Sequence, residues 1–77
     1  MKKSYQRDIK KFGTGIKFLR EKNSFTQQKL SDLCDLDIRT IQRIEKGDHS
    51  IGLHILYALA DSFKLSLPEL LKEIEHE

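Results

Sequence analysis

Four long polar side chains recur at helical spacing within residues 35–47, DLDIRTIQRIEKG. They share one side of a helical wheel: Arg39, Gln42, Arg43 and Lys46. Ile41 and Ile44 lie on the opposite side and could hold such a helix against a core. Exposed helices usually mix acids with bases, but this polar side has no acid, and each of its members can donate hydrogen bonds. Its chemistry suits a partner that carries negative charge and hydrogen-bond acceptors.

Charge is distributed unevenly along the chain. Through Lys46 there are twelve Lys and Arg against six Asp and Glu, a net +6, whereas from Gly47 onward two basic residues face six acidic ones, a net −4. This polarity suggests a basic surface that meets an anion and an acidic end that stays away from it. Chance clustering on a solvated surface explains the charge counts equally well.

The length and composition indicate a single small domain. A chain of 77 residues buries only about 60% of its unfolded surface, so its core is marginal and a partner chain could stabilise it. No apolar run reaches the roughly 20 residues that cross a bilayer, the Met1 end has no apolar signal stretch, and the single cysteine allows no internal disulfide. We expect a soluble cytoplasmic protein with a basic arm at residues 1–7 and one domain at 8–77.

The hydrophobic spacing predicts five helices and no strand, hence an all-α fold around one core. The expected helices cover residues of about 8–22, 27–34, 38–46, 52–63 and a last segment opened by Ser66. Their apolar faces are expected to include Leu33 in the second helix, Leu53 in the fourth and Leu71 in the fifth. Gly13 and Gly15 each weaken the first helix by roughly 1 kcal/mol relative to Ala, which indicates either a close contact or a later helix start.

Capping residues mark several of these helix ends. Thr26 and Asp37 are good N-caps for the second and third helices, and Gly47 is a natural terminator of the third. Ser66 and Glu69 have the spacing of a capping box. Because only about three residues separate the second helix from the third, the two form a helix-turn-helix unit.

Three segments carry a resemblance to a known family: IKFLREKNSFTQQKL, LDIRTIQRIEKG and LHILYALADSFKLSLPEL. Their most specific marks are Arg20, the Thr26–Gln27 pair, the IxxIEKG motif that ends at Gly47, and the Leu59–Ala60 pair. Over residues 12–71 the chain resembles the phage-repressor and Cro type of helix-turn-helix domain, the XRE family. The resemblance implies a compact five-helix, lambda-repressor-like domain that binds double-stranded DNA, usually as a two-fold dimer.

Two positions in the helix-turn-helix unit depart from the family pattern. Asp35 stands where the turn commonly has Gly, and Ser31 stands where a small Ala is common. Asp can adopt a left-handed conformation at some cost, and Ser31 is small enough to let the two helices pack. The fold is therefore expected to persist.

The resemblance makes residues 38–46 a recognition helix, whose N-terminal part contacts base edges in the major groove. Arg39 and Arg43 are the first candidates, since each could bind O6 and N7 of a guanine; the alternative is a solvated face or phosphate contacts. Gln42 and Thr40 could reach bases or phosphates. Ile38 could pack on a thymine methyl or complete the edge of the core. The predicted base contacts are Ile38, Arg39, Gln42 and Arg43.

Phosphate contacts should supply most of the affinity. Gln27 lies in the first turn of the second helix, where free N–H groups favour an anion, and the resemblance implies a phosphate contact there. His49 and Ser50, in the loop after the recognition helix, are a second expected backbone clamp. The predicted phosphate contacts are Gln27, Thr40, Lys46, His49 and Ser50, and possible additional ones are Arg7, Lys10, Lys11 and Lys17.

Arg20 and Glu45 are expected to have a structural role. The resemblance suggests that they pair, tying the first helix to the end of the third. A buried pair gives little net stability, but breaking one side costs about 3–5 kcal/mol. We do not count either residue among the DNA contacts.

An enzyme is not expected. His49, His54 and His76 lack zinc-ligand spacing, Cys34 has no CxxC partner and lies on an expected buried face, and the chain has no Gly-rich phosphate loop. We therefore expect no metal, no cofactor and no small-molecule ligand.

The expected function is sequence-specific binding of double-stranded DNA by a transcriptional regulator such as a repressor, acting as a homodimer on a palindromic or pseudo-palindromic operator. The rival is an antitoxin-like or other protein-interaction module of the same fold, with DNA binding secondary. Its contact surface would be apolar residues of the last two helices: Leu53, Tyr57, Leu67 and Leu71. An interaction module has no need for an acid-free strip of Arg, Gln and Lys, so DNA is favoured.

Overall fold

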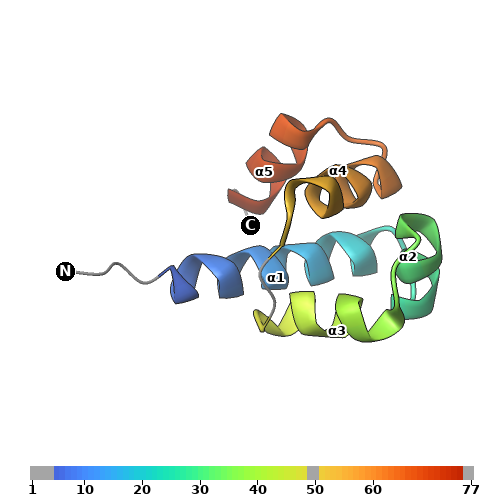
Figure 1. Cartoon of the computed structure of the whole chain (residues 1–77). Helices are drawn as coiled ribbons and strands as arrows, with labels where there is room; N and C mark the ends of the chain where they lie inside the picture. Colours follow the sequence, from blue (N-terminus) through green and yellow to red (C-terminus); the bar gives the residue numbers. More distant parts are fainter. Residues whose placement is uncertain (1–4, 49–50, 76–77) are drawn as a thin grey trace.

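The computed structural model describes residues 5–48 and 51–75. Over these residues the chain forms five α-helices and no strand, which confirms the all-α prediction: α1 (Gln6–Lys22), α2 (Gln27–Cys34), α3 (Ile38–Lys46), α4 (Leu53–Ser62) and α5 (Leu67–Glu75). The long α1 runs through the middle of the molecule, with α3 along its lower side, α4 and α5 above it, and α2 at one end (Figure 1). α1 thus contacts both α3 and α5.

Local hydrogen bonds explain where several helices begin and end. The Thr26 hydroxyl accepts from the backbone N–H of Lys29 at 3.0 Å and so caps α2. Ser66 and Glu69 form the predicted capping box: the Ser66 N–H donates to Glu69 Oε1 at 2.8 Å, and the Glu69 N–H donates to Ser66 Oγ at 3.3 Å. These bonds lower the pKa of the Glu69 carboxyl. Gly47 ends α3 with a left-handed φ of 77°.

Three predicted helix ends differ from the structure. α1 begins at Gln6 rather than near residue 8, so Gln6 and Arg7 are helical and do not belong to an arm. Asp8 consequently lies in the first turn of α1, where a carboxylate interacts favourably with the helix dipole. α4 is one residue shorter at each end than the predicted 52–63. Asp37 occupies the N-cap position of α3, but its side chain makes no capping hydrogen bond.

The turn between α2 and α3 uses both residues that depart from the family pattern. Asp35 adopts the left-handed conformation, with φ 55° and ψ 46°, as the sequence predicts. Its neighbour Leu36 donates its N–H to the Ser31 carbonyl at 2.9 Å, which closes the turn. Ser31 is buried, and its hydroxyl donates to the Gln28 carbonyl at 2.7 Å. A small side chain with an internal partner therefore allows the two helices to pack.

All five helices contribute to one hydrophobic core. Its members are Ile16, Leu19, Leu30, Cys34, Ile41, Ile44, Ile55, Leu59, Ala60, Phe63, Leu70 and Ile74. The prediction that Leu33 lies on the buried face of α2 is wrong, because Leu33 is exposed. Leu53 and Leu71, expected on an apolar face that could be core or interface, are exposed as well. The core side of α4 instead passes through Ile55 and Leu59, so Leu53 is rotated away from it.

Gly13 and Gly15 allow α1 to approach its neighbours closely, and α1 is not interrupted at either residue. A Cβ atom at Gly13 would collide with the backbone carbonyl oxygen of Ile44 and would lie 3.0 Å from that of Glu45. A Cβ atom at Gly15 would lie 2.7 Å from Cγ1 of Ile74. Of the two interpretations of these glycines, the close contact is therefore correct.

We expect Gly13→Ala to reduce the free energy of unfolding by about 1–3 kcal/mol, the usual cost of overpacking. The loss should occur even though Ala has a higher helix propensity than Gly. The methyl group would meet a carbonyl oxygen of the α3 backbone, which cannot move away without a shift of the helix. Thr14→Ala is the matched control, since Thr14 is the next residue of α1 and is exposed. Urea denaturation measures both. A Gly13→Ala protein as stable as Thr14→Ala would contradict this account of the α1–α3 contact.

Candidate nucleic-acid interface

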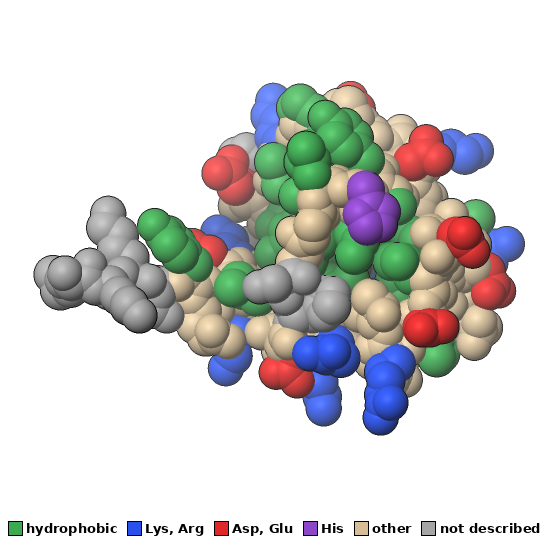
Figure 2. Space-filling model, viewed as in Figure 1, with side chains coloured by type: hydrophobic (Ala, Val, Ile, Leu, Met, Phe, Trp, Pro, Cys, Tyr) green, Lys and Arg blue, Asp and Glu red, His purple; other side chains and the backbone are tan. Residues whose placement is uncertain are grey.

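The polar strip identified in the sequence lies on the outer side of α3. Ile41 and Ile44 are buried beneath the helix, whereas the strip is exposed along its length: Arg39, Gln42, Arg43 and Lys46. Figure 2 shows Lys and Arg side chains gathered along the lower edge of the molecule, the edge formed by α3 in Figure 1. Three of the four predicted base-contact residues, Arg39, Gln42 and Arg43, are thus exposed together on one edge of the molecule.

The two other residues of α3 with predicted DNA contacts lie at the border of this edge. Ile38, the first residue of the helix, is 37% exposed, so its side chain is neither core nor fully in solvent. Thr40 is half-buried. Their contacts with DNA remain predictions.

Arg43 has a partner within the chain. One of its guanidinium nitrogens, Nη2, donates to the backbone carbonyl of Asp48 at 3.3 Å, just after the end of α3. The Asp48 N–H in turn donates to the Arg43 carbonyl at 2.9 Å. The bond to the guanidinium is exposed, so Arg43 can exchange it for a base or phosphate acceptor.

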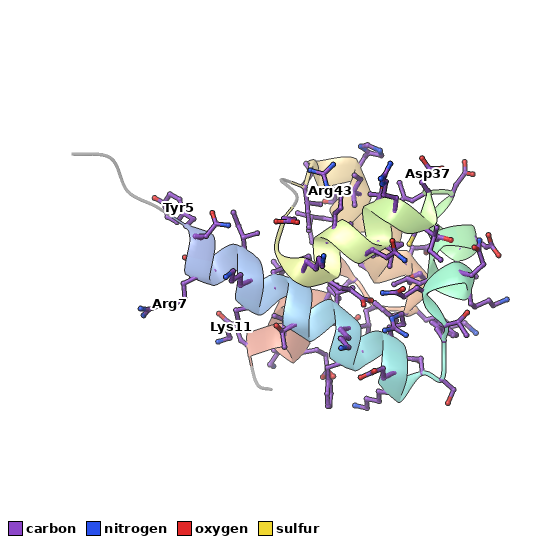
Figure 3. The ribbon with its side chains drawn as sticks, turned by 90° about the horizontal axis from the view of Figure 1, so that it is seen from below. Tyr5, Arg7, Lys11, Asp37 and Arg43 are labelled. Carbon is purple, nitrogen blue, oxygen red and sulfur yellow. The ribbon has the colours of Figure 1, made fainter. Side chains whose placement is uncertain are left out.

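The positive charges of α1 are divided between its sides. Seen from below, Arg7 and Lys11 lie on the side of α1 away from α3, whereas Arg43 projects from α3 itself (Figure 3). Lys17 instead borders a hollow between the helices, together with Lys46 of α3. Of these three α1 cations, Lys17 is therefore the one that extends the basic edge.

Beneath the strip, Arg20 and Glu45 form an ion pair between α1 and the last turn of α3. Arg20 Nε donates to Glu45 Oε2 at 2.6 Å and Nη2 donates to Oε1 at 3.2 Å. The third bond of the guanidinium, from Nη1, goes to the Phe25 carbonyl at 2.9 Å. The two side chains are 10% and 5% exposed. The hydrogen bond with Glu45 raises the pKa of Arg20, so the cation persists at any ordinary pH.

Gln27 connects this ion pair to the surface of α3, which the sequence analysis did not foresee. Its Nε2 donates to Glu45 Oε1 at 3.1 Å, and its Oε1 accepts from Nε2 of Gln42 at 3.4 Å. The partners lie 18 and 15 residues away along the chain, so no local pattern signals these bonds. The phosphate contact predicted for the Gln27 side chain would compete with them, whereas its backbone N–H at the start of α2 has no such conflict.

A polar hollow of about 350 Å³ opens between α1, α2 and α3. Its lining residues are Lys17, Gln27, Gln42, Glu45 and Lys46. It brings together two predicted phosphate contacts, Gln27 and Lys46, and one predicted base contact, Gln42. Of the other three predicted phosphate contacts, Thr40 lies at the border of the strip, and His49 and Ser50 lie outside the described residues.

The described residues offer little for other chemistry. Cys34 is buried, and its thiol lies 3.6 Å from the Ala58 carbonyl. Burial raises the pKa of that thiol, which disfavours the reactive thiolate. Within residues 5–48 and 51–75, no three His, Cys, Asp or Glu side chains are grouped so as to hold a metal ion. None of the described helices has the length and apolar character needed to cross a membrane.

Removal of one side of the buried ion pair should be costly. We expect Arg20→Ala to lower the free energy of unfolding by about 3–5 kcal/mol, because it leaves the Glu45 carboxylate buried without its cation. Lys22→Ala is the control: the Lys22–Glu73 pair spans 3.8 Å with side chains 60% and 48% exposed, and such surface pairs contribute about 0–1 kcal/mol. Urea denaturation at neutral pH compares the two variants. Equal losses would mean that the Arg20–Glu45 pair does not support the fold.

Comparison with known proteins agrees with this geometry. The family described as helix-turn-helix matches residues 16–70. A competence pilus inhibition repressor of Acinetobacter baylyi is 31% identical over 58 residues, which are 75% of this chain and 53% of that protein. The chain therefore spans about half the length of this relative.

Solved structures show the same fold. The restriction-modification controller protein C.AhdI from Aeromonas hydrophila superposes with a TM-score of 0.80 at 28% identity, covering 83% of this chain and 97% of that one. The clp gene regulator ClgR from Corynebacterium glutamicum superposes with a TM-score of 0.79 at 15% identity, covering 87% and 71%, and this likeness concerns the fold alone. With more than half of its length matched, the chain belongs to the XRE family of helix-turn-helix proteins, whose fold is that of DNA-binding transcription regulators.

Proposed function

We propose that this protein is a sequence-specific regulator of transcription that binds double-stranded DNA with α3 in the major groove. The observation that carries the proposal is the outer side of α3, where Arg39, Gln42 and Arg43 are exposed while Ile41 and Ile44 anchor the helix in the core. The major groove is about 12 Å wide and admits one helix whose long side chains reach base edges. Such a protein would act in the cytoplasm, without catalysis, metal or cofactor.

The contacts that we propose divide into two sets. Arg39 and Arg43 bind guanines and Ile38 packs on a thymine methyl, while Gln42 completes the base contacts. Gln27, through its backbone N–H, binds a phosphate, as do Thr40 and Lys46, with His49 and Ser50 as a further clamp. Two similar proteins support the regulatory function itself, since one is a repressor and the other is a restriction-modification controller protein.

We further propose that two copies bind a palindromic operator. Leu53 and Tyr57, one turn apart on α4, are 62% and 56% exposed, and Leu71 on α5 is exposed as well. Figure 2 shows apolar side chains gathered over the region of α4 and α5, on the opposite side of the molecule from α3. For both α3 helices to face one DNA, about 34 Å apart in successive major grooves, the second copy would pack against the lateral part of this surface, because a copy packed directly opposite α3 would point its own α3 away from the DNA. The same surface would serve a different protein if the chain were an antitoxin-like module.

Selection from a randomised DNA pool at near-physiological salt tests the proposed function. The protein should enrich a two-fold symmetric motif, and Arg43→Ala should lose discrimination at one base position of each half-site, worth about 1–3 kcal/mol. Lys10→Ala is the control: the loss of this exposed cation should weaken binding to all sequences alike and lower the salt dependence slightly. Binding that enriches no motif and disappears as salt rises would refute sequence-specific recognition. An Arg43→Ala protein that selects the parent motif would refute the role of Arg43.

A second experiment tests the dimer. We expect the double variant Leu53→Asp, Tyr57→Asp to sediment as a monomer at concentrations where the parent sediments as a dimer, because two charges would then be buried without partners. Phe18→Asp is the matched control, since Phe18 is also an exposed apolar residue but belongs to α1. Analytical ultracentrifugation measures the masses. A parent protein that is monomeric even on its selected DNA would contradict the homodimer and favour a different protein partner.

A further inference from the structure

We infer that Gln42 recognises an adenine in each half-site and that Gln27 is the positioning residue that makes it prefer adenine to guanine. The inference rests on the proposed function and assigns a base to one of its contacts. It follows from the direction of the hydrogen bonds that begin at the buried Glu45 carboxylate and end at the surface of α3.

The first step is that the charge of Glu45 fixes the orientation of the Gln27 amide. Both carboxylate oxygens of Glu45 accept from the Arg20 guanidinium, at 2.6 and 3.2 Å, and a carboxylate paired with a guanidinium only accepts hydrogen bonds. The Gln27 group that lies 3.1 Å from Glu45 Oε1 must therefore be the NH₂ group. With its nitrogen facing inward, Gln27 presents its carbonyl oxygen to Gln42.

The second step is that Gln42 is oriented in turn. The Gln27 oxygen can only accept, so the group of Gln42 that lies 3.4 Å from it is again the NH₂ group. Reversal of the Gln42 amide would place two carbonyl oxygens against each other. Gln42 itself is exposed and borders the polar hollow beside Lys46, so the rest of its amide is accessible to a ligand.

The third step concerns the hydrogen-bonding groups of the Gln42 amide that remain free for a base. Its NH₂ group has two hydrogens, and one is used by Gln27, which leaves one N–H donor beside one free carbonyl acceptor. Adenine presents the complementary pair in the major groove, with N7 as acceptor and the N6 amino group as donor. Guanine presents two acceptors, N7 and O6. A glutamine with both N–H groups free can donate to both guanine acceptors, whereas Gln42 bound to Gln27 lacks the second donor.

The roles of the two residues are therefore separable. Gln42 touches the base, so its loss should remove the base preference at that position. Gln27 acts through Gln42, so its loss should leave base binding possible but admit guanine. Without Gln27 the amide can rotate and both of its N–H groups become available.

The experiment is selection from a randomised DNA pool with the full chain and three variants, followed by anisotropy titrations of the selected operator with adenine or guanine at the assigned position. Gln42→Met removes the amide that contacts the base. Gln27→Met removes the hydrogen bonds that orient Gln42 and keeps the side-chain length. Gln28→Met is the matched control, because the neighbouring Gln28 is exposed and its side-chain amide donates to Ser31 and Asp32 within α2.

We expect the parent to prefer adenine over guanine at one position of each half-site by on the order of tenfold. Gln42→Met should lose all preference there, Gln27→Met should reduce the adenine-to-guanine ratio several-fold without changing the other positions, and Gln28→Met should match the parent. The readout for Gln27 is thus a base ratio, which a general loss of stability would not change. Should Gln27→Met fail to fold, the exposed Gln42 still decides the identity of the base.

Three results would overturn the inference. The position that responds to Gln42→Met could be a base other than adenine, no position could respond, or Gln27→Met could leave the adenine-to-guanine ratio unchanged. In each case a motif would still be enriched, so the proposed function would stand. A parent protein that enriches no motif would overturn both.

Discussion

The ion pair of Arg20 and Glu45 is the contact on which the rest of the domain depends. Burial of two charges is expensive, and here the cost is offset by hydrogen bonds on every side: Glu45 accepts from Arg20 and Gln27, and Arg20 also donates to the Phe25 carbonyl. The pair fixes the last turn of α3 to α1 at the point where Gly13 lets the two backbones meet. It thereby fixes the position of α3 and of its exposed side relative to α1.

The same pair determines the charge of the exposed side of α3. Glu45 is the only acid between Ile38 and Lys46, and it points inward to Arg20. Its negative charge is thus neutralised beneath the helix, and the outer side carries no acid. Two acids, Asp37 and Asp48, flank the helix ends and would repel phosphate there. Affinity would consequently depend more on contacts from the middle of α3 than on general attraction to DNA.

The remaining surfaces are divided between two tasks. The basic edge lies at α3 and the hollow beside it, while the exposed apolar side chains of α4 lie on the opposite side, in the acidic half of the chain. In a domain this small the core uses few residues, so apolar side chains such as Leu53 remain available for a partner. Separation of the surfaces would allow DNA and a second protein chain to be bound at once.

The sequence by itself determined the helices, the caps at Thr26, Gly47 and Ser66, and the strip on α3, because these depend on residues only a few positions apart, as in the Ser66–Glu69 box. Only the tertiary structure decided how each helix is rotated, which exposed Leu33 against expectation and left Leu53 at the surface rather than in the core. It alone also decided the partners of the site residues, such as Asp48 for Arg43 and Glu45 for Gln27. The physical reason is that periodicity reports one helix at a time, whereas burial and hydrogen-bond partners depend on where three helices meet.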